Sequence, residues 1–378
     1  MIKFQVIISV FQSENIFMLC IKSLLMSIRQ PTEIILINDG SNFDCMDCIY
    51  NNFTVSQNVS FQYIIHPVSI GFALSINQGI QLVEPDTYVV FADSDVIFCE
   101  NWQNEVTKTL SDSTIGAVGG ILIYPQTGGI QCCGITYMDK LARHLYLNNK
   151  ISNLNLPSQF SVQATIFAFF AAKSNIILET GSLDEQYFNG YEDIDYQMRI
   201  RQRGYKIVTN TNLILYHFEK SNGMHRQYSR RQNLGIFWSQ NSSFIKNDLE
   251  EYLEYQLKNY KLFSKEYILV NMCEATLNAS KVIKYLETKF SITSVLDVSN
   301  LCTIQTKIWF PEILSSDSYA VQKSYIFLCD NFIELTENSY WINLRKNYSY
   351  TDIIIDLYAN VIPLLELENV CWPGNKIR

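Results

Sequence analysis

The sequence predicts an α/β protein: a mixed sheet with flanking helices in the first part of the chain, followed by a smaller α/β domain. Two observations lead to this prediction. Short apolar runs that read as buried strands alternate with longer segments of helical periodicity. In addition, strands that follow one another through helices tend to lie parallel in one sheet. With 378 residues, the chain exceeds one ordinary domain.

The elements of the first part follow from apolar runs and turn residues. Phe4–Val10 is a continuous apolar strand, and Pro31 ends the helix that comes after it. Asn38–Ser41 is a turn signal at the end of the second strand. Strands are expected at residues 4–10, 33–38, 61–65, 88–91, 116–123, 165–172 and 213–217, and helices at residues 13–28, 71–82 and from residue 192 onward.

The remainder of the chain repeats the alternation of strands and helices. We expect a helix over residues 247–261, and then strands and helices over residues 266–273, 277–286, 294–298, 325–329 and 352–365. The predicted domains are residues 1–245, a helical linker over 246–262 and a small α/β domain over 263–378. The turn at residues 271–276 lacks a glycine-rich phosphate loop, so no second cofactor is assigned there. Acceptor recognition or oligomerisation is the hypothesis for this domain.

Composition excludes several classes of protein. A hydrophobic content of 48% and a charged content of 17% indicate a globular chain. The net charge of −8 and the lack of a Lys/Arg run argue against nucleic-acid binding. No apolar stretch is long enough for a transmembrane segment and no cleavage signature follows Met1, which favours a soluble, cytoplasmic protein. Cys45 and Cys48 form a Cys-x-x-Cys without a second pair, so the ten cysteines are interpreted as reduced thiols.

Two carboxylates stand at the end of a buried strand. Asp93-Ser94-Asp95 follows the apolar run of residues 87–91. Open parallel sheets bind ligands at the carboxyl ends of their strands, and clustered carboxylates suit a divalent cation. We interpret the segment as a metal-diphosphate site; the alternative is a loop cap with solvated aspartates.

A second group of charges lies further along. Glu192, Asp193 and Asp195 would occupy the first turn of a helix whose last turn is basic and which is followed by Gly204. This distribution suits the helix macrodipole. Asp195 and Arg199 are also spaced for a surface ion pair. The functional alternative is that a carboxylate fixed at a helix start acts as a general base.

Several motifs together resemble a known family. They are the opening strand Val6–Val10, the turn Asn38-Asp39-Gly40-Ser41, the spacing Gly71-x5-Asn77-x-Gly79, Asp93-Ser94-Asp95, and the segment from Leu183 to Arg199. In this order they resemble the GT-A-fold inverting glycosyltransferases that use nucleotide-diphospho-sugars, the family 2-like enzymes. The resemblance covers about residues 1–240, and it implies a Rossmann-like nucleotide-diphospho-sugar transferase fold.

The resemblance implies a donor site. Val10 and Phe11 would form a wall of the base pocket, and Asp39 would accept a hydrogen bond from the base imide. Asp93 would lie near the ribose and the metal, and Asp95 would bind the metal directly. The cofactor is expected to be Mn²⁺ or Mg²⁺. Gly71, Asn77 and Ser94 complete the nucleotide-binding residues of the motif. The alternative interpretation is that Asp39 is only a turn former.

On the acceptor side, the resemblance assigns the general base to Asp193 and an orienting role to Glu192. His217, at the end of a strand, is expected to be the third metal ligand, with His225 in reserve. His66 and His144 receive no role. Three arginines after His217 either reach the diphosphate or form a solvated helix face: Arg226, Arg230 and Arg231.

We therefore predict a metal-dependent inverting glycosyltransferase. It would move a sugar from a nucleotide-diphospho-sugar to a hydroxyl of a glycan, lipid-linked or protein-linked acceptor, and peripheral association with a membrane is compatible with this. Two alternatives remain. One is a sugar nucleotidyltransferase, for which the sequence lacks a triphosphate-binding loop. The other is a scaffold protein that binds a nucleotide sugar without turnover.

Overall fold

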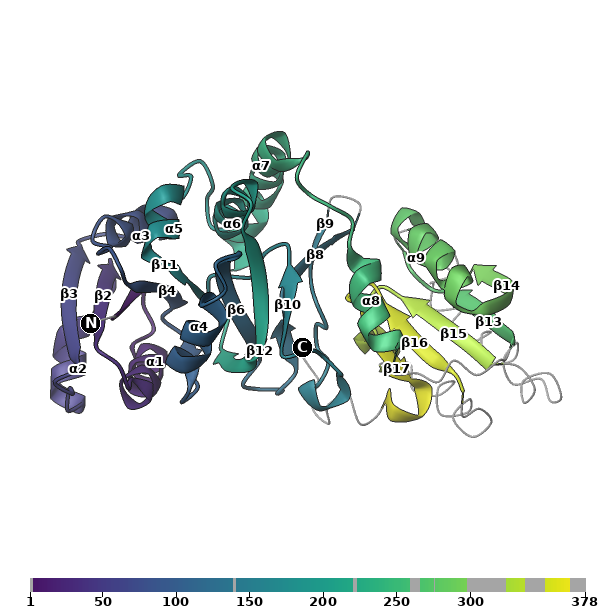
Figure 1. Cartoon of the computed structure of the whole chain (residues 1–378), viewed down its shortest axis with the longest axis horizontal. Coiled ribbons are helices and arrows are strands. Elements are labelled where there is room, and N and C mark those ends of the chain that lie inside the picture. Colours follow the sequence, from purple (N-terminus) through teal and green to yellow (C-terminus); the bar gives the residue numbers. More distant parts are fainter. Residues whose placement is uncertain are drawn as a thin grey trace. The chain divides into compact units, whose positions relative to one another are not determined.

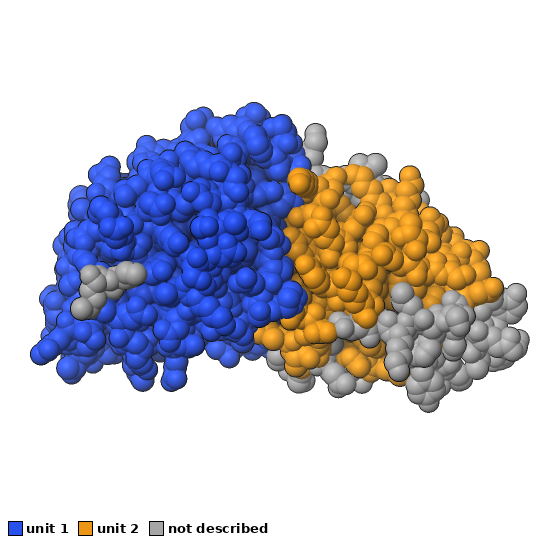
Figure 2. Space-filling model, in the orientation of Figure 1, with its two compact units in different colours: residues 1–135, 157–245 blue, residues 136–156, 246–378 orange. Residues whose placement is uncertain are grey.

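A computed structural model describes most of the chain: residues 3–138, 141–219, 223–258, 266–274, 276–297, 324–336 and 351–367. The chain divides into two compact units (Figure 2). Unit 1 consists of residues 1–135 and 157–245, and unit 2 of residues 136–156 and 246–378. The domain boundaries given above stay a prediction.

Unit 1 is built on a mixed sheet (Figure 1). Its strand order is β10-β12-β6-β11-β4-β1-β2-β3, with β5 paired to β12 and β7 to β6. The strands are β1 (Phe4–Val10), β2 (Thr32–Asp39), β3 (Val59–His66), β4 (Tyr88–Asp93), β5 (Val96–Ile97), β6 (Ile115–Ile123), β7 (Ile130–Cys132), β10 (Gln159–Val162), β11 (Phe169–Lys173) and β12 (Lys206–His217). The helices are α1 (Glu14–Ser27), α2 (Cys45–Asn52), α3 (Phe72–Ile80), α4 (Trp102–Leu110), α5 (Ser174–Thr180), α6 (Glu192–Gln202) and α7 (Gly223–Asn241). The predicted fold class, a mixed α/β sheet with flanking helices, is confirmed.

The strand that carries the first aspartates lies inside this sheet. β4 pairs in parallel with β1 and antiparallel with β11. β1 also pairs in parallel with β2, in a register that places Val10 beside Asn38 and Ser9 beside Asp93. Because these three strands are parallel, their carboxyl ends meet at one edge of the sheet. Val10, Asn38 and Asp93 therefore end at the same edge.

Aromatic side chains show that helices cover both faces of the sheet. Phe169 packs against Trp102 of α4, at 6.3 Å between ring centroids. The next residue, Phe170, points to the other face and contacts Phe91 and Tyr196 of α6. Alternation of this kind is expected within a strand. The strand predicted over residues 165–172 is therefore only partly correct: β11 begins at Phe169, and residues 165–168 precede it as buried or partly buried loop and turn.

Unit 2 has a five-stranded sheet in the order β14-β13-β15-β16-β17, all parallel except β17. Its strands are β13 (Glu266–Asn271), β14 (Ser291–Asp297), β15 (Ser324–Cys329), β16 (Ile353–Asp356) and β17 (Val361–Pro363). Its helices are α8 (Leu249–Leu257), α9 (Thr276–Lys289), α11 (Ile333–Thr336) and the short 3₁₀ helices η1 (Ile151–Asn153) and η3 (Leu364–Glu366). β8 (Ile135–Met138) and β9 (Leu141–His144) form a separate two-stranded sheet.

Hydrogen bonds explain why residues 136–156 belong to unit 2. The Asp248 carboxylate accepts from the Thr136 hydroxyl at 2.5 Å and from the backbone N–H of Tyr137 at 3.1 Å. Further along, Asn149 donates to the side chain of Asn360 at 2.9 Å. These side chains are buried, and buried polar groups of this kind are costly to separate.

Glycine is required where β6 meets β12. A Cβ atom at Gly120 would lie against the backbone oxygen of Leu213 and 2.7 Å from Cδ1 of Leu215. We expect Gly120→Ala to lower the stability of unit 1 by about 1–3 kcal/mol, because a paired strand cannot move away freely. The measurement is the melting temperature. Gly235→Ala in α7 is the control, since nothing lies within 4 Å of the added carbon. Equal melting temperatures for the two variants would contradict this packing.

Candidate active site

Three candidate metal ligands come together in unit 1. Nε2 of His217 lies 3.1 Å from Oδ1 of Asp95 and 3.4 Å from Oδ2 of Asp93. Pairing between β5 and β12 explains the approach, because His217 is the register partner of Val96. The backbone N–H of Phe218 also donates to the Asp95 carbonyl at 3.2 Å. Residues more than 120 positions apart in the sequence are thereby fixed beside the end of β4.

The other side of the imidazole ring is held by a glutamine. Nδ1 of His217 lies 2.7 Å from Oε1 of Gln131, and Nε2 of Gln131 donates to Glu219 at 2.8 Å. Since an amide oxygen only accepts, Nδ1 carries the proton. Nε2, which faces the aspartates, is then the ring atom that can bind a metal. Gln131 was not identified from the sequence.

Electrostatics at this position favour a cation. His217 is buried, which alone lowers the pKa of its imidazole. Hydrogen bonds to Asp93 and Asp95 outweigh this effect and raise the pKa to about 10. The same carboxylates that stabilise an imidazolium would stabilise a divalent cation.

The donor set fits such an ion. Two carboxylates and a neutral imidazole are ligands that Mn²⁺ accepts, whereas Mg²⁺ would use mainly the carboxylates. The candidate ligand atoms all lie within 4.8 Å of one another. Within the part of the chain that the structure describes, this is the one group of three or more His, Cys, Asp or Glu side chains with such spacing. Ser94 lies between the two aspartates and is partly exposed.

The turn after β2 is organised by Asp39. One carboxylate oxygen accepts from His66 at 2.9 Å and from the backbone of Ile70 at 2.8 Å. The other accepts from the Ser69 hydroxyl at 2.6 Å and from the backbone of Gly71 at 3.2 Å. Burial raises the pKa of this carboxyl, but the hydrogen bonds outweigh burial and lower it below its usual value. Asp39 therefore fixes the loop that leads into α3.

Close approach of the backbone completes this turn. Gly40 has φ 76°, and a Cβ atom there would meet the backbone of Val68 and Ser69. Ser41 donates to the Val10 carbonyl at 3.0 Å, which links the turn to the end of β1. Val10 is buried, whereas Phe11 is 44% exposed. The side chain of Phe11, which was expected to form a wall of the base pocket, is therefore accessible to a ligand.

Asn77 connects α3 to the second group of charges. Its side chain accepts from the backbone N–H of Leu183 at 2.7 Å, and donates to the Leu183 carbonyl at 3.1 Å and to Glu185 at 3.0 Å. Asn77 is buried. These contacts tie the motif that begins at Gly71 to the segment that leads into α6.

The acidic residues at the start of α6 differ in their environment. Glu192 is buried and accepts from the backbone of Gly190 at 2.5 Å. Asp193 is partly exposed, and one of its carboxylate oxygens accepts from Ile194 N–H at 2.8 Å. The Asp193 carbonyl accepts from Gln197 at 3.1 Å, and Gln197 also binds Thr165. Asp193 is thus the more accessible carboxylate on a fixed helix start.

The pKa of the Cys132 thiol reports on the carboxylates that lie near β7. Its pKa is raised to about 12. Burial is the main cause, and the negative charges of Asp193 and Glu219 contribute to the same shift. Both carboxylates therefore lie within electrostatic range of β7, whose neighbouring residue Gln131 holds His217. β7 therefore has a neighbour in each group: Asp193 affects the pKa of Cys132, and Gln131 contacts His217.

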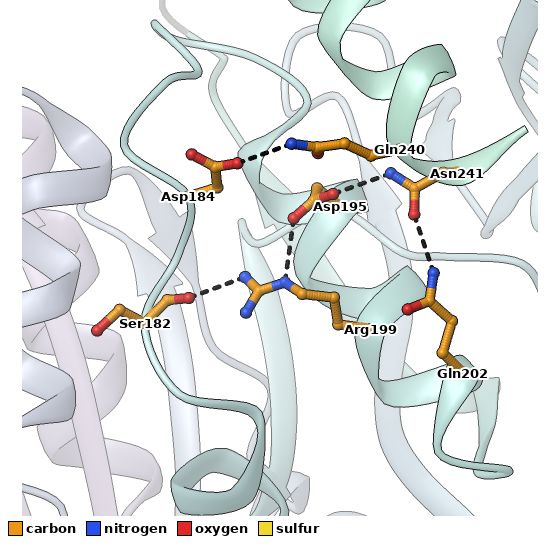
Figure 3. A pocket seen from close by; sticks show the side chains of 7 residues that line it. All are labelled: Ser182, Asp184, Asp195, Arg199, Gln202, Gln240 and Asn241. Atoms are coloured by element: carbon orange, nitrogen blue, oxygen red, sulfur yellow. Dashed lines mark hydrogen bonds and ion pairs between the residues drawn. The ribbon is translucent and has the colours of Figure 1, made fainter.

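The pair of Asp195 and Arg199 forms as predicted, at 3.1 Å, but the Asp195 side chain is buried instead of lying at the surface. Asn241 of α7 donates to the same carboxylate at 2.9 Å. These residues line a pocket of about 300 Å³ between α6, α7 and the preceding loop (Figure 3). Its lining consists of Ser182, Asp184, Asp195, Arg199, Gln202, Gln240 and Asn241.

The cysteine pair and the residues after His217 were also singled out from the sequence. Cys45 and Cys48 lie in α2, and burial is the main cause that raises their thiol pKa values, to about 12 and about 11. The side chains of His225, Arg226 and Arg230 lie outside the described part of the structure. No helix in the described ranges combines the length and the apolar character needed to cross a membrane.

Comparison with solved structures finds distant likeness. A mannosyltransferase, PcManGT from Pyrobaculum calidifontis, in complex with GDP-Man and Mn²⁺, is 14% identical, with a TM-score of 0.47 and 65% of each chain covered. GalNAc-T7 with UDP, GalNAc and Mn²⁺ is 18% identical, with a TM-score of 0.47, 58% of this chain and 44% of that one. S. aureus TarS is 13% identical, with a TM-score of 0.43, 66% of this chain and 47% of that one. The chain thus spans 44 to 65% of the length of these structures.

Comparison with curated proteins found no match. Among protein families, the model of Glycosyl transferase family 2 matches residues 5–170. This range includes the strand β1, the turn at Asp39 and both aspartates of the candidate metal site. Residues 5–170 are thus similar to glycosyl transferase family 2, the family that the motifs of the chain resemble.

Proposed function

We propose that the protein is a metal-dependent, inverting glycosyltransferase that uses a nucleotide-diphospho-sugar donor. The observation that carries the proposal is the group of Asp93, Asp95 and His217 at the carboxyl end of β4, whose two aspartates lie in the segment that the family 2 model matches. Bound there, Mn²⁺ or Mg²⁺ would neutralise the charge that develops on the departing diphosphate. Asp95 and His217 would bind the ion, and Asp93 would lie between the ion and the ribose.

For the donor nucleotide, we propose the pocket beside the carboxyl ends of β1 and β2. Val10 and Phe11 would form its wall, and Gly71, Asn77 and Ser94 would support its position. Each carboxylate oxygen of Asp39 already accepts two hydrogen bonds. A base imide that binds Asp39 would therefore replace one of these donors or share an oxygen with it.

For the acceptor, we propose Asp193 as the general base. Its carboxylate would take the proton from the acceptor hydroxyl while that oxygen attacks the anomeric carbon from the face opposite the diphosphate. The bond between the anomeric carbon and the diphosphate oxygen breaks as the new glycosidic bond forms, so the configuration inverts. Glu192 would orient this region through its bond to Gly190. A glycan, lipid-linked or protein-linked acceptor and a cytoplasmic location remain predictions.

The base is tested by Asp193→Asn. We expect transfer to fall by about 10²- to 10⁴-fold, because an amide cannot take the proton. The donor Kd should not change, since Asp193 is placed on the acceptor side. The measurements are product formation and calorimetric titration with a panel of nucleotide sugars. Asp112→Asn, in the turn after α4, is the control and should retain activity. Full turnover by Asp193→Asn would exclude this residue as the base.

The metal is tested by donor binding. With EDTA, binding of the nucleotide sugar should be lost, and Mn²⁺ or Mg²⁺ should restore it, because the diphosphate charge is then neutralised. Asp95→Asn should prevent the restoration, whereas Asp112→Asn should behave as wild type. Electron paramagnetic resonance would report Mn²⁺ binding directly, without turnover. Unchanged nucleotide-sugar binding in EDTA would refute metal dependence.

The role of Gln131 is tested by Gln131→Met, which removes the acceptor that fixes the His217 ring. We expect Mn²⁺ affinity to fall by about 10- to 100-fold, the usual effect of losing a partner that orients a ligand. Gln103→Met is the control: it removes a buried glutamine that accepts from the backbone of Arg29 at 2.7 Å and donates to Thr32 at 2.9 Å, neither of which is a residue of the proposed site. Equal Mn²⁺ affinity in wild type and Gln131→Met would show that His217 is not a ligand oriented in this way.

A further inference from the structure

Three aromatic side chains lie close together in the sequence just before α6, and two of them are anchored. The hydroxyl of Tyr187 lies 3.0 Å from Oε1 of Gln240 and 3.4 Å from Oδ1 of Asp195, and Tyr187 is buried. The ring of Tyr191 packs against Phe237 of α7, with 5.2 Å between centroids. These contacts fix both ends of a short loop against α6 and α7.

The third aromatic side chain, Phe188, is 55% exposed although its backbone is held on both sides. Asn233 of α7 accepts from the Phe188 N–H at 3.3 Å. Its amide nitrogen donates to the carbonyls of Phe188 at 2.9 Å and of Gly190 at 2.8 Å. Asn233 is only 2% exposed. Its three hydrogen bonds fix the backbone that carries an exposed ring.

The conformation of this loop is unusual. Asn189, Gly190 and Tyr191 all have positive φ, at 49°, 144° and 75°. Non-glycine residues in this region are strained, and such strain persists where the surrounding structure holds it and is often found at functional sites. The ring of Phe188 stands exposed directly before this strained segment, although burial would be favourable for a phenylalanine.

The loop also sets the start of the helix that carries the proposed base. The N–H of Gly190 donates to Glu192, and the carbonyl of Tyr191 accepts from Asp195 as the first hydrogen bond of α6. Phe188 stands five residues before Asp193 on this fixed segment. Its exposed neighbours in sequence are polar, namely Gln186 and Asn189. A ligand at this position therefore meets one apolar ring surrounded by hydrogen-bonding groups.

We infer that Phe188 is a specificity-determining residue that stacks on the sugar ring of a carbohydrate acceptor. A pyranose has an apolar C–H face and a rim of hydroxyls, which matches a lone aromatic ring among polar side chains. The partly positive C–H groups are attracted to the negative face of the ring. Because the loop is already fixed, little conformational entropy is lost on binding. This inference rests on the proposed function and names the acceptor class as a glycan.

The test uses the full chain with Mg²⁺, a nucleoside diphosphate and a panel of methyl glycosides of glucose, galactose, mannose and N-acetylglucosamine. Saturation-transfer NMR should show signal on the C–H protons of at least one glycoside. In Phe188→Ala we expect the affinity for that glycoside to fall by about three- to tenfold, the range for one aromatic contact. In transfer assays, KM for the glycoside should rise by the same factor. The kcat, the donor Kd and the slow hydrolysis of the donor should not change.

Matched variants separate stacking from a loss of folding. Phe188→Tyr and Phe188→Trp keep an aromatic face and should retain binding, whereas Phe188→Leu should behave like Phe188→Ala. Leu178→Ala on α5 removes a side chain of similar exposure, 48%, and should change nothing. Asn233→Ala keeps the ring but releases the loop, so it should weaken glycoside binding as well.

Two results would overturn the inference: glycoside binding that is equal in Phe188→Ala and wild type, or no glycoside binding to wild type. Donor titration on the same samples shows whether the proposed function fails with it. If the nucleotide sugar binds normally, only the acceptor assignment is wrong. If no nucleotide sugar binds either, the glycosyltransferase proposal itself is refuted.

Discussion

Two carboxylates that emerge together at the end of one buried strand repel each other, and the structure around them compensates for that repulsion. β4 ends at Asp93, and both aspartates face the imidazole of His217, a group that can carry positive charge. Nε2 of His217 lies within 3.4 Å of both side chains, and these carboxylates raise the pKa of the imidazole, which favours its charged form when no metal is bound. A divalent cation would supply more charge at the same place. The pairing of β5 with β12 brings this positive group to the aspartates, so the end of β12 belongs to the site as much as β4 does.

The elements that the sequence revealed are those with a strong local signal. β1, β2 and β4 are continuous apolar runs, and their predicted ends lie within a few residues of the observed ones. α2 was missed because it is short, although Asp44 caps it by accepting from Met46 and Asp47. The antiparallel direction of β11 has no local signal, since an antiparallel strand buried on both faces shows the same apolar run as a parallel one.

The site residues also divide into those with a local sequence signal and those without one. The aspartates of the candidate metal site were proposed from a motif at a strand end, whereas Gln131 was not identified, because its partners His217 and Glu219 are more than eighty positions away. Glu219 stands two residues after the histidine, but nothing in a single sequence links it to β7. Asn233 is a similar case: it binds a loop more than forty positions earlier. Polar residues whose role is to hold other residues carry no motif of their own.

These holding residues connect the proposed donor side of unit 1 to the proposed acceptor side. Asn77 in α3 binds the backbone of Leu183, at the beginning of the loop that leads into α6. Gln197 in α6 binds Thr165, just before β11, which pairs with β4. The helix that carries Asp193 is therefore tied both to α3 and to the segment before β11, the strand that pairs with β4, at whose end the two aspartates of the candidate metal site lie. A general base and a metal must face one reacting carbon from opposite sides, and a small displacement between them would be costly for transfer. The buried amides of Asn77 and Gln197 oppose such a displacement, because breaking their paired hydrogen bonds leaves buried polar groups unsatisfied.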